Sequence, residues 1–185
     1  MKELKNKLKS IVSTLNKQEL DSLFPEIAEY LMKNFGIKAK GKVYLLNEIE
    51  FYYYDSLYDD IRSDSKTKHI TYERTASAGS WFMHNYGVDL TFESDKEKGY
   101  GGGILIRSIE DMATLKAITG PVNCVNELWM EAVDAFSPTA QNPFIIRVDK
   151  RDIELDVPTT RIKVDKVDQW QSLWRFTVRG KKISK

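Results

Sequence analysis

The segment Glu48-Ile49-Glu50-Phe51-Tyr52 holds residue types that acid–base catalysis needs. If it forms a strand, Glu48, Glu50 and Tyr52 share one face, and the apolar residues between them face the core. Two carboxylates roughly 7 Å apart along a strand can raise each other's pKa, which would prepare a general base. Solvated strand faces show the same spacing, so the pattern alone leaves both interpretations open.

An aromatic run from Trp81 to Asp89 is a second candidate. Two short strand-like segments, 80–85 and 88–93, flank Tyr86-Gly87, which predicts a tight hairpin with Tyr86 at its tip. An exposed aromatic side chain at such a tip can act as a wedge between stacked bases. Packing beneath a loop is the alternative for a single tyrosine.

Arg107 interrupts an otherwise apolar strand that begins at Ile104. Because a buried, unpaired guanidinium is costly, Arg107 should pair with a carboxylate such as Glu50 or Glu93, or face a cleft. The alternative is an edge strand with Arg107 at the surface.

Metal and phosphate sites are not indicated. His69 and His84 are the only histidines, and with Asp64 and Asp89 they match no recurring zinc spacing, so we expect no metal site. The glycine-dense segment 99–103 precedes a strand instead of opening a helix, so it is not a phosphate-binding loop.

The C-terminal segment 161–185 carries eight Lys or Arg residues against two Asp. Tryptophans and a phenylalanine are interleaved with these charges. A basic patch with aromatics is typical of a nucleic-acid backbone site, with Arg161, Arg175 and Arg179 as its contacts. A solvated tail has the same composition.

Length, charge and cysteine content exclude several classes of protein. The chain has 185 residues and a formal net charge of +1, whereas proteins that coat nucleic acid non-specifically are usually far more basic. Cys124 is the only cysteine, so no internal disulfide can form, and we expect a cytoplasmic protein. The apolar runs are far shorter than the roughly 20 residues that span a bilayer, so no membrane segment is expected.

The first 36 residues have the apolar spacing of helices. One helix should end near Leu15, and Asn16 with Glu19 has the capping-box spacing that begins a second. Pro25 predicts that this second helix starts near Ser22 or is kinked.

The pattern changes to short strands from residue 42 onward. We expect helices at 109–118 and 122–135, a loop at 55–68, and strands at 43–54, 80–85, 88–93, 104–109, 144–148, 153–157, 161–164 and 174–179. Most connections are too short for parallel crossovers. The expected fold is therefore α+β: a single domain over residues 1–185, with a helical segment at 1–36 and a core at 42–185. That core would be a mostly antiparallel, curved β-sheet with one or two packed helices.

Six segments in this order resemble the alkyladenine (3-methyladenine) DNA glycosylase family. The strand at 47–52 is similar to the family's E-T-E-A-Y strand, and 80–92 to its aromatic Y-x-Y-x-x-Y-G hairpin. GILIRSI at 103–109 is similar to V-L-I-R-A-L, and Gly120-Pro121 with the helix after it is similar to G-P-x-x-L-x-x-A-L. RIKV at 161–164 is similar to R-I-G-I, and WRFTVRG at 174–180 is similar to W-R-F-Y-V-x-G. The resemblance extends from about Lys42 to the end of the chain.

The resemblance assigns a role to several residues. Glu50 falls on the catalytic glutamate, which activates the water that attacks the sugar C1′, and Tyr52 on the tyrosine that stacks on the flipped base. Tyr86 falls on the wedge, Arg107 on the arginine near the site, and His69 on the pocket histidine.

Two positions depart from the family pattern. Met83 stands where the family has a second pocket tyrosine, and Glu93 where it has the asparagine that helps to exclude normal bases. His84 and Asp89 have no counterpart in the family.

The resemblance implies an N-glycosylase that excises an alkylated or deaminated purine from double-stranded DNA by base flipping, as a monomer and without a cofactor. One alternative keeps the fold but binds or cleaves a small nucleoside-like ligand in a diverged pocket. The other is a non-catalytic nucleic-acid-binding module.

Overall fold

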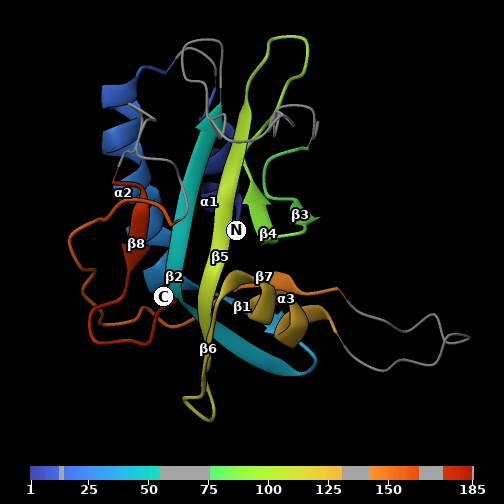
Figure 1. The fold of residues 1–185 in the computed structure, drawn as a ribbon, viewed down its shortest axis with the longest axis vertical. Helices are drawn as coiled ribbons and strands as arrows, with labels where there is room; N and C mark the ends of the chain where they lie inside the picture. The colour runs from blue at the N-terminus through green and yellow to red at the C-terminus, as the bar shows by residue number, and fades with distance from the viewer. Residues whose placement is uncertain (13–14, 55–75, 131–141, 163–172, 185) are drawn as a thin grey trace, which may run out of the picture.

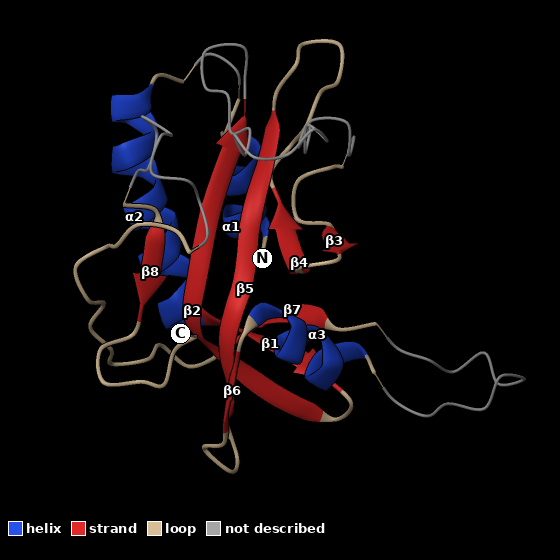
Figure 2. Cartoon of the chain, in the orientation of Figure 1, coloured by secondary structure: helices blue, strands red, loops and turns tan. Residues whose placement is uncertain are grey.

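The computed structural model describes residues 1–12, 15–54, 76–130, 142–162 and 173–184. Over these residues the chain folds into helices packed against a curled antiparallel sheet, which confirms the expected α+β class (Figure 2). The helices are α1 (Lys2–Lys9), α2 (Lys17–Asn34) and α3 (Pro121–Trp129). The strands are β1 (Phe35–Ala39), β2 (Lys42–Tyr54), β3 (Trp81–His84), β4 (Gly87–Thr91), β5 (Gly101–Asp111), β6 (Ala117–Thr119), β7 (Phe144–Arg147) and β8 (Arg175–Thr177).

The sheet has the strand order β3-β4-β5-β2-β1-β7, with β6 added to β5 and β8 added to β2. Its centre is the long pair β2 and β5, which lie side by side along the molecule (Figure 1). The β3–β4 hairpin lies on one side of this pair, and α2 with β8 on the other (Figure 1). The middle of β2 and β5 is thus flanked by β8, which pairs with β2, and by β4, which pairs with β5.

The helix α2 covers one face of β2. Its capping box is present as predicted, since the Asn16 side chain accepts from the Glu19 N–H and the Glu19 carboxylate accepts from the Asn16 N–H. The helix does not start near Ser22 but runs on through Pro25. A proline inside a helix costs about 3 kcal/mol. That cost is offset by the side chains of α2 that are 0% exposed, namely Leu20, Phe24, Ile27, Ala28, Leu31 and Met32.

Aromatic side chains join α2 to the sheet. The Phe24 ring lies 4.6 Å from that of Phe51 and 4.8 Å from that of Trp174, centroid to centroid. Ile49, Phe51 and Tyr53 are all at most 1% exposed, so the apolar face of β2 faces the core as predicted. Glu50 and Tyr52 must therefore lie on the opposite face.

Segment 109–118 is not a helix, contrary to the sequence-based expectation. Its first residues end β5, and Ile109 pairs with Ile118 of β6. The reversal between them is an Asp turn, in which the Asp111 carboxylate accepts from the N–H groups of Ala113 (2.9 Å) and Thr114 (3.2 Å). Leu115 has a positive φ of 57°, which a helix cannot accommodate. A local side-chain hydrogen bond overrides the helical pattern here.

Other boundaries also differ from the expectation. Residues 35–39 form β1, so the helical segment ends before the expected residue 36. Segment 153–157 makes only an isolated bridge, Leu155 to Val178, and Arg161 and Ile162 lie outside any strand. The predicted loop at 55–68 and residues 163–164 lie outside the described residues.

The β3–β4 hairpin is confirmed, with its turn one residue earlier than expected. His84 pairs with Gly87, so Asn85 and Tyr86 form the turn. Gly87 is required there for two reasons. Its φ is 150°, and a Cβ at this position would come within 2.8 Å of Pro121 on α3.

Candidate functional site

One row of the sheet carries polar side chains on the face opposite the core. Residues directly opposite each other in an antiparallel sheet point to the same face. Leu105 of β5 pairs with Glu50 of β2 on one side and with Asp89 of β4 on the other, and Asp89 pairs in turn with Phe82 of β3. The topology therefore places Glu50 and Asp89 on one face, about two strand spacings or roughly 10 Å apart.

Glu48 and Glu50 are both buried, so they do not form a solvated strand face. They are 0% and 6% exposed, respectively. Arg107 bridges them: its Nε lies 3.1 Å from Glu48 Oε1, and its Nη1 lies 3.3 Å from Glu50 Oε2. The expected pairing of Arg107 with Glu50 is thus present, and this strand charge is not at the surface.

Both oxygens of the Glu48 carboxylate accept hydrogen bonds, and several of these come from Ser184 near the end of the chain. Besides Arg107, it accepts from Arg175 Nε at 2.7 Å and from the Ser184 N–H at 2.6 Å. The Ser184 hydroxyl also donates to it at 2.8 Å. Because these donors satisfy both oxygens, Glu48 is a structural group that ties the residues around Ser184 to the centre of the sheet.

Contacts from the described residues hold the Glu50 carboxylate at one oxygen. Its Oε2 faces Arg107 and accepts from the Ile162 N–H at 3.1 Å. Among the described residues, no hydrogen bond reaches Oε1. Burial raises the pKa of Glu50, while Arg107, the Ile162 N–H and, more weakly, Arg161 and Arg175 partly offset that effect. The cause of the raised pKa is therefore burial, and not the neighbouring Glu48 carboxylate that the sequence pattern suggested.

Tyr52 lies across β5 and not along its own strand. Its hydroxyl donates a short hydrogen bond to Asp89 Oδ2 on β4. This crossing passes over Gly103, where a Cβ would come within 3.0 Å of the Tyr52 hydroxyl oxygen. The glycine-dense segment does not end before the strand as expected, because residues 101–103 begin β5, and Gly103 leaves room there for the Tyr52 hydroxyl.

The His84 ring contacts both Asp89 and the tip of the β3–β4 hairpin. Its Nε2 lies 3.1 Å from Asp89, and its Nδ1 accepts from the Tyr86 N–H at 3.2 Å. Asp89 is 0% exposed, whereas the Tyr86 side chain is 53% exposed at the turn. The His84 side chain therefore connects the buried Asp89 carboxylate to the backbone N–H of the exposed Tyr86.

The remaining predicted pocket residues lie elsewhere. Met83 is 47% exposed and, as the neighbour of His84 in β3, points to the other face of that strand. Glu93, which follows β4, accepts from the Ala78 N–H at 3.0 Å and so holds the turn that precedes β3. His69 lies outside the described residues.

The three arginines of the predicted basic patch are not gathered on one surface. Arg175 points inward to Glu48, and Arg161 is 8% exposed, with its guanidinium 5.9 Å from the centre of the Trp174 ring. Arg179 is exposed, but it forms ion pairs with Glu154 and Asp156.

Sequence reasoning missed the roles of Asp89, His84 and Ser184. From the sequence, Asp89 and His84 are candidates only for a metal site, which is not expected, and have no other role in the aromatic run. A polar residue between Val88 and Leu90 in a strand was the available signal, because it must face away from the apolar side. Nothing in the sequence indicates that Ser184 reaches Glu48, 136 positions earlier.

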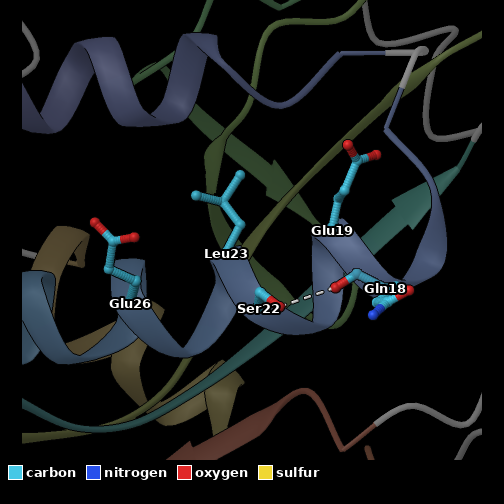
Figure 3. A pocket seen from close by; sticks show the side chains of 5 residues that line it. All are labelled: Gln18, Glu19, Ser22, Leu23 and Glu26. Carbon is cyan, nitrogen blue, oxygen red and sulfur yellow. Dashed lines mark hydrogen bonds between the residues drawn. The ribbon is translucent and has the colours of Figure 1, made fainter.

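A surface depression on α2 holds no comparable arrangement. Figure 3 shows its lining side chains, Gln18, Glu19, Ser22, Leu23 and Glu26, which all come from that one helix. Their polar groups are used locally: Ser22 donates to the Gln18 carbonyl at 3.0 Å, and Glu26 pairs with Lys7. The depression is therefore a feature of the helix surface.

Neither a metal cluster nor a membrane-spanning helix is found in the described part of the chain. No three His, Cys, Asp or Glu side chains there are grouped to hold a metal ion. No helix among the same residues is both long and apolar enough to cross a bilayer.

Comparison with known proteins adds no family. No family model and no curated protein sequence matches this chain.

Proposed function

We propose that this protein hydrolyses an N-glycosidic bond, with Glu50 as the general base, and that its substrate is a damaged purine in duplex DNA. The observation that carries the proposal is the state of Glu50. It is a buried carboxylate with a raised pKa, and only one of its oxygens is bound among the described residues. A general base needs a fixed position and an oxygen left for the water it activates.

In the proposed reaction, Glu50 Oε1 accepts a proton from a water molecule while the water oxygen bonds to the sugar C1′. The bond from C1′ to the base nitrogen breaks, and its electron pair leaves with the base, which takes a proton from solvent. Arg107 holds Oε2 and keeps the carboxylate oriented. The sugar would pass through an oxocarbenium-like state, for which a nearby carboxylate is a suitable partner.

The exposed ring at the hairpin tip supports duplex DNA as the substrate. An enzyme that acts on a base inside a duplex must extrude it, and an inserted side chain fills the gap that the base leaves. Tyr86, 53% exposed in the β3–β4 turn, has the position and size for this role. The six segments that resemble motifs of the alkyladenine DNA glycosylases, in the same order, favour the same substrate, and we propose a cytoplasmic location for this activity.

A second candidate, hydrolysis of a small nucleoside, is favoured by one observation. Arg161 and Arg175 are turned inward, and Arg179 is paired with acidic residues, so these arginines offer little unpaired positive charge to a DNA backbone. Binding to DNA draws most of its affinity from such charges.

The test is single-turnover base release from duplex oligonucleotides that carry hypoxanthine, ethenoadenine or 3-methyladenine. Wild type is compared with Glu50→Gln and with the exposed control Glu97→Gln, and the free nucleosides are assayed in parallel. We expect release from at least one lesion by wild type and by Glu97→Gln, and a loss of about a thousandfold in Glu50→Gln.

Release from free nucleosides alone would replace the DNA substrate with the small-ligand alternative. Duplex binding without release from any substrate would leave a nucleic-acid-binding module. Equal release by wild type and Glu50→Gln would remove Glu50 as the base.

A further inference from the structure

A chain of hydrogen bonds joins β2, which carries Glu50, to the tip of the β3–β4 hairpin. It runs from the Tyr52 hydroxyl to Asp89, from Asp89 to His84 Nε2, and from His84 Nδ1 to the Tyr86 N–H. We call these contacts the Asp89 link. One end is Tyr86, which the proposed function places in the duplex. The other is Tyr52, which the resemblance to the glycosylase family places on the flipped base.

The contacts of His84 define its tautomer. Nδ1 lies 3.2 Å from a backbone N–H that can only donate, so this nitrogen accepts and carries no proton. Nε2 then bears the proton and donates to Asp89 at 3.1 Å. The Asp89 carboxylate thus accepts from both His84 and Tyr52.

Steric contacts leave the members of the link little freedom to move. The His84 ring centre lies 6.2 Å from that of Phe82 and 6.1 Å from that of Tyr86. Asp89 is 0% exposed, and Gly103 leaves only enough space for the Tyr52 hydroxyl. These neighbouring groups therefore form a continuous path of contacts from the hairpin tip to Tyr52.

We propose that Asp89 and His84 are positioning residues that couple the wedge to the base-stacking ring, so that insertion of Tyr86 and placement of Tyr52 occur together. This inference rests on the proposed function. Breaking the link lowers the extent of base extrusion. It leaves the affinity for the duplex backbone and the Glu50 carboxylate in place, because neither residue contacts Glu50 or Arg107 through a hydrogen bond or ion pair among the described residues.

The experiment separates extrusion from both binding and cleavage. All variants are made in the Glu50→Gln background, so that the base stays attached. The duplex carries 2-aminopurine beside hypoxanthine, and its fluorescence rises when the neighbouring base leaves the stack. Fluorescence anisotropy of a second label measures duplex affinity.

His84→Phe keeps an aromatic ring between Phe82 and Tyr86 but removes both nitrogens. Asp89→Asn keeps the shape but offers a single acceptor oxygen to two donors. We expect each change to lower the extrusion equilibrium roughly tenfold, the size of one hydrogen bond to a charged group, with duplex affinity within about twofold. Glu97→Gln, on the exposed turn before β5, should change neither quantity.

A double-mutant cycle tests the coupling itself. Tyr52→Phe removes the hydroxyl that binds Asp89 and keeps the ring. If both residues act through Asp89, Tyr52→Phe combined with His84→Phe loses no more extrusion than the more damaging single change. Additive losses would overturn the proposal.

The remaining outcomes are distinct from one another. No fluorescence change with the Glu50→Gln parent, at concentrations that saturate the duplex, would mean that the proposed function fails and the inference with it. Normal extrusion in the parent and in the folded His84→Phe protein would overturn the inference alone. Should Asp89→Asn prove unfolded by circular dichroism, His84→Phe and Tyr52→Phe carry the test.

Discussion

Replacement by glutamine should have different effects on the stability of the protein at the two buried glutamates of β2, Glu48 and Glu50. Glu48 binds two guanidinium groups and a backbone N–H, whereas Glu50 binds, within the described part of the chain, one side of Arg107 and the Ile162 N–H. Changing each to glutamine preserves the shape and removes the charge. The pair therefore separates a structural carboxylate from one kept for chemistry.

The expected cost for Glu48→Gln is about 3 kcal/mol in the free energy of unfolding. Removing one member of a buried ion pair typically costs about 3–5 kcal/mol. Glutamine retains one acceptor oxygen, which places the loss at the lower end of that range. Arg175 is the residue most affected, because Glu48 is its ion-pair partner among the described residues.

Glu50→Gln should leave the stability at pH 7 within about 1 kcal/mol of wild type, or raise it. Burial raises the pKa of Glu50, so the folded state holds that proton more tightly than the unfolded chain does. This contribution to stability is complete below the ordinary carboxyl pKa and is lost as the pH rises through the raised value. A neutral glutamine removes that loss, and Arg107 still has Glu48.

Urea unfolding followed by circular dichroism at pH 7 measures both variants, with the slope against urea as a check for two-state behaviour. The catalytic assay is run on the same preparations. If Glu50→Gln proved as destabilising as Glu48→Gln, Glu50 would be another member of the structural ion-pair network, and the general-base assignment would be refuted.

Three further predictions follow from the site and its surroundings. The wild-type rate should rise with pH through a pKa above the usual carboxyl range, because Glu50 must lose its proton to act as a base; a rate independent of pH from 4 to 8 would contradict this. Gly103→Ala should lower stability by about 1–3 kcal/mol and impair base extrusion as Tyr52→Phe does, since the added Cβ meets the Tyr52 hydroxyl; urea unfolding and 2-aminopurine fluorescence measure the two effects. Cys124 should react with a disulfide reagent only after unfolding, because burial raises the pKa of its thiol to about 12; rapid labelling of the native protein would disprove this.

The sequence was sufficient where local signals agree with burial. The capping box at Asn16 and Glu19 and the apolar face of β2 were both predictable, because hydrogen-bonding partners three residues apart and alternating side chains are properties of one segment. The hairpin before β5 was predictable for the same reason. The apolar pattern wrongly predicted a helix at 109–118, because a hydrogen bond from the Ala113 N–H to the Asp111 side chain favours a turn there.

What the sequence determined about the candidate site is the face on which Glu50 and Tyr52 lie. Tertiary structure decided which glutamate keeps an oxygen without a hydrogen bond among the described residues. That depends on donors from distant segments: Arg175 and Ser184 reach Glu48, and Ile162 reaches Glu50. It also decided that the Tyr52 hydroxyl reaches Asp89, since the strand order places β4 next to β5 and the missing Cβ at Gly103 leaves room for the hydroxyl. The spacing of residues along one strand specifies the face of the sheet to which each side chain points. The pKa of a side chain and its hydrogen-bond partners depend instead on what the rest of the chain packs against that strand.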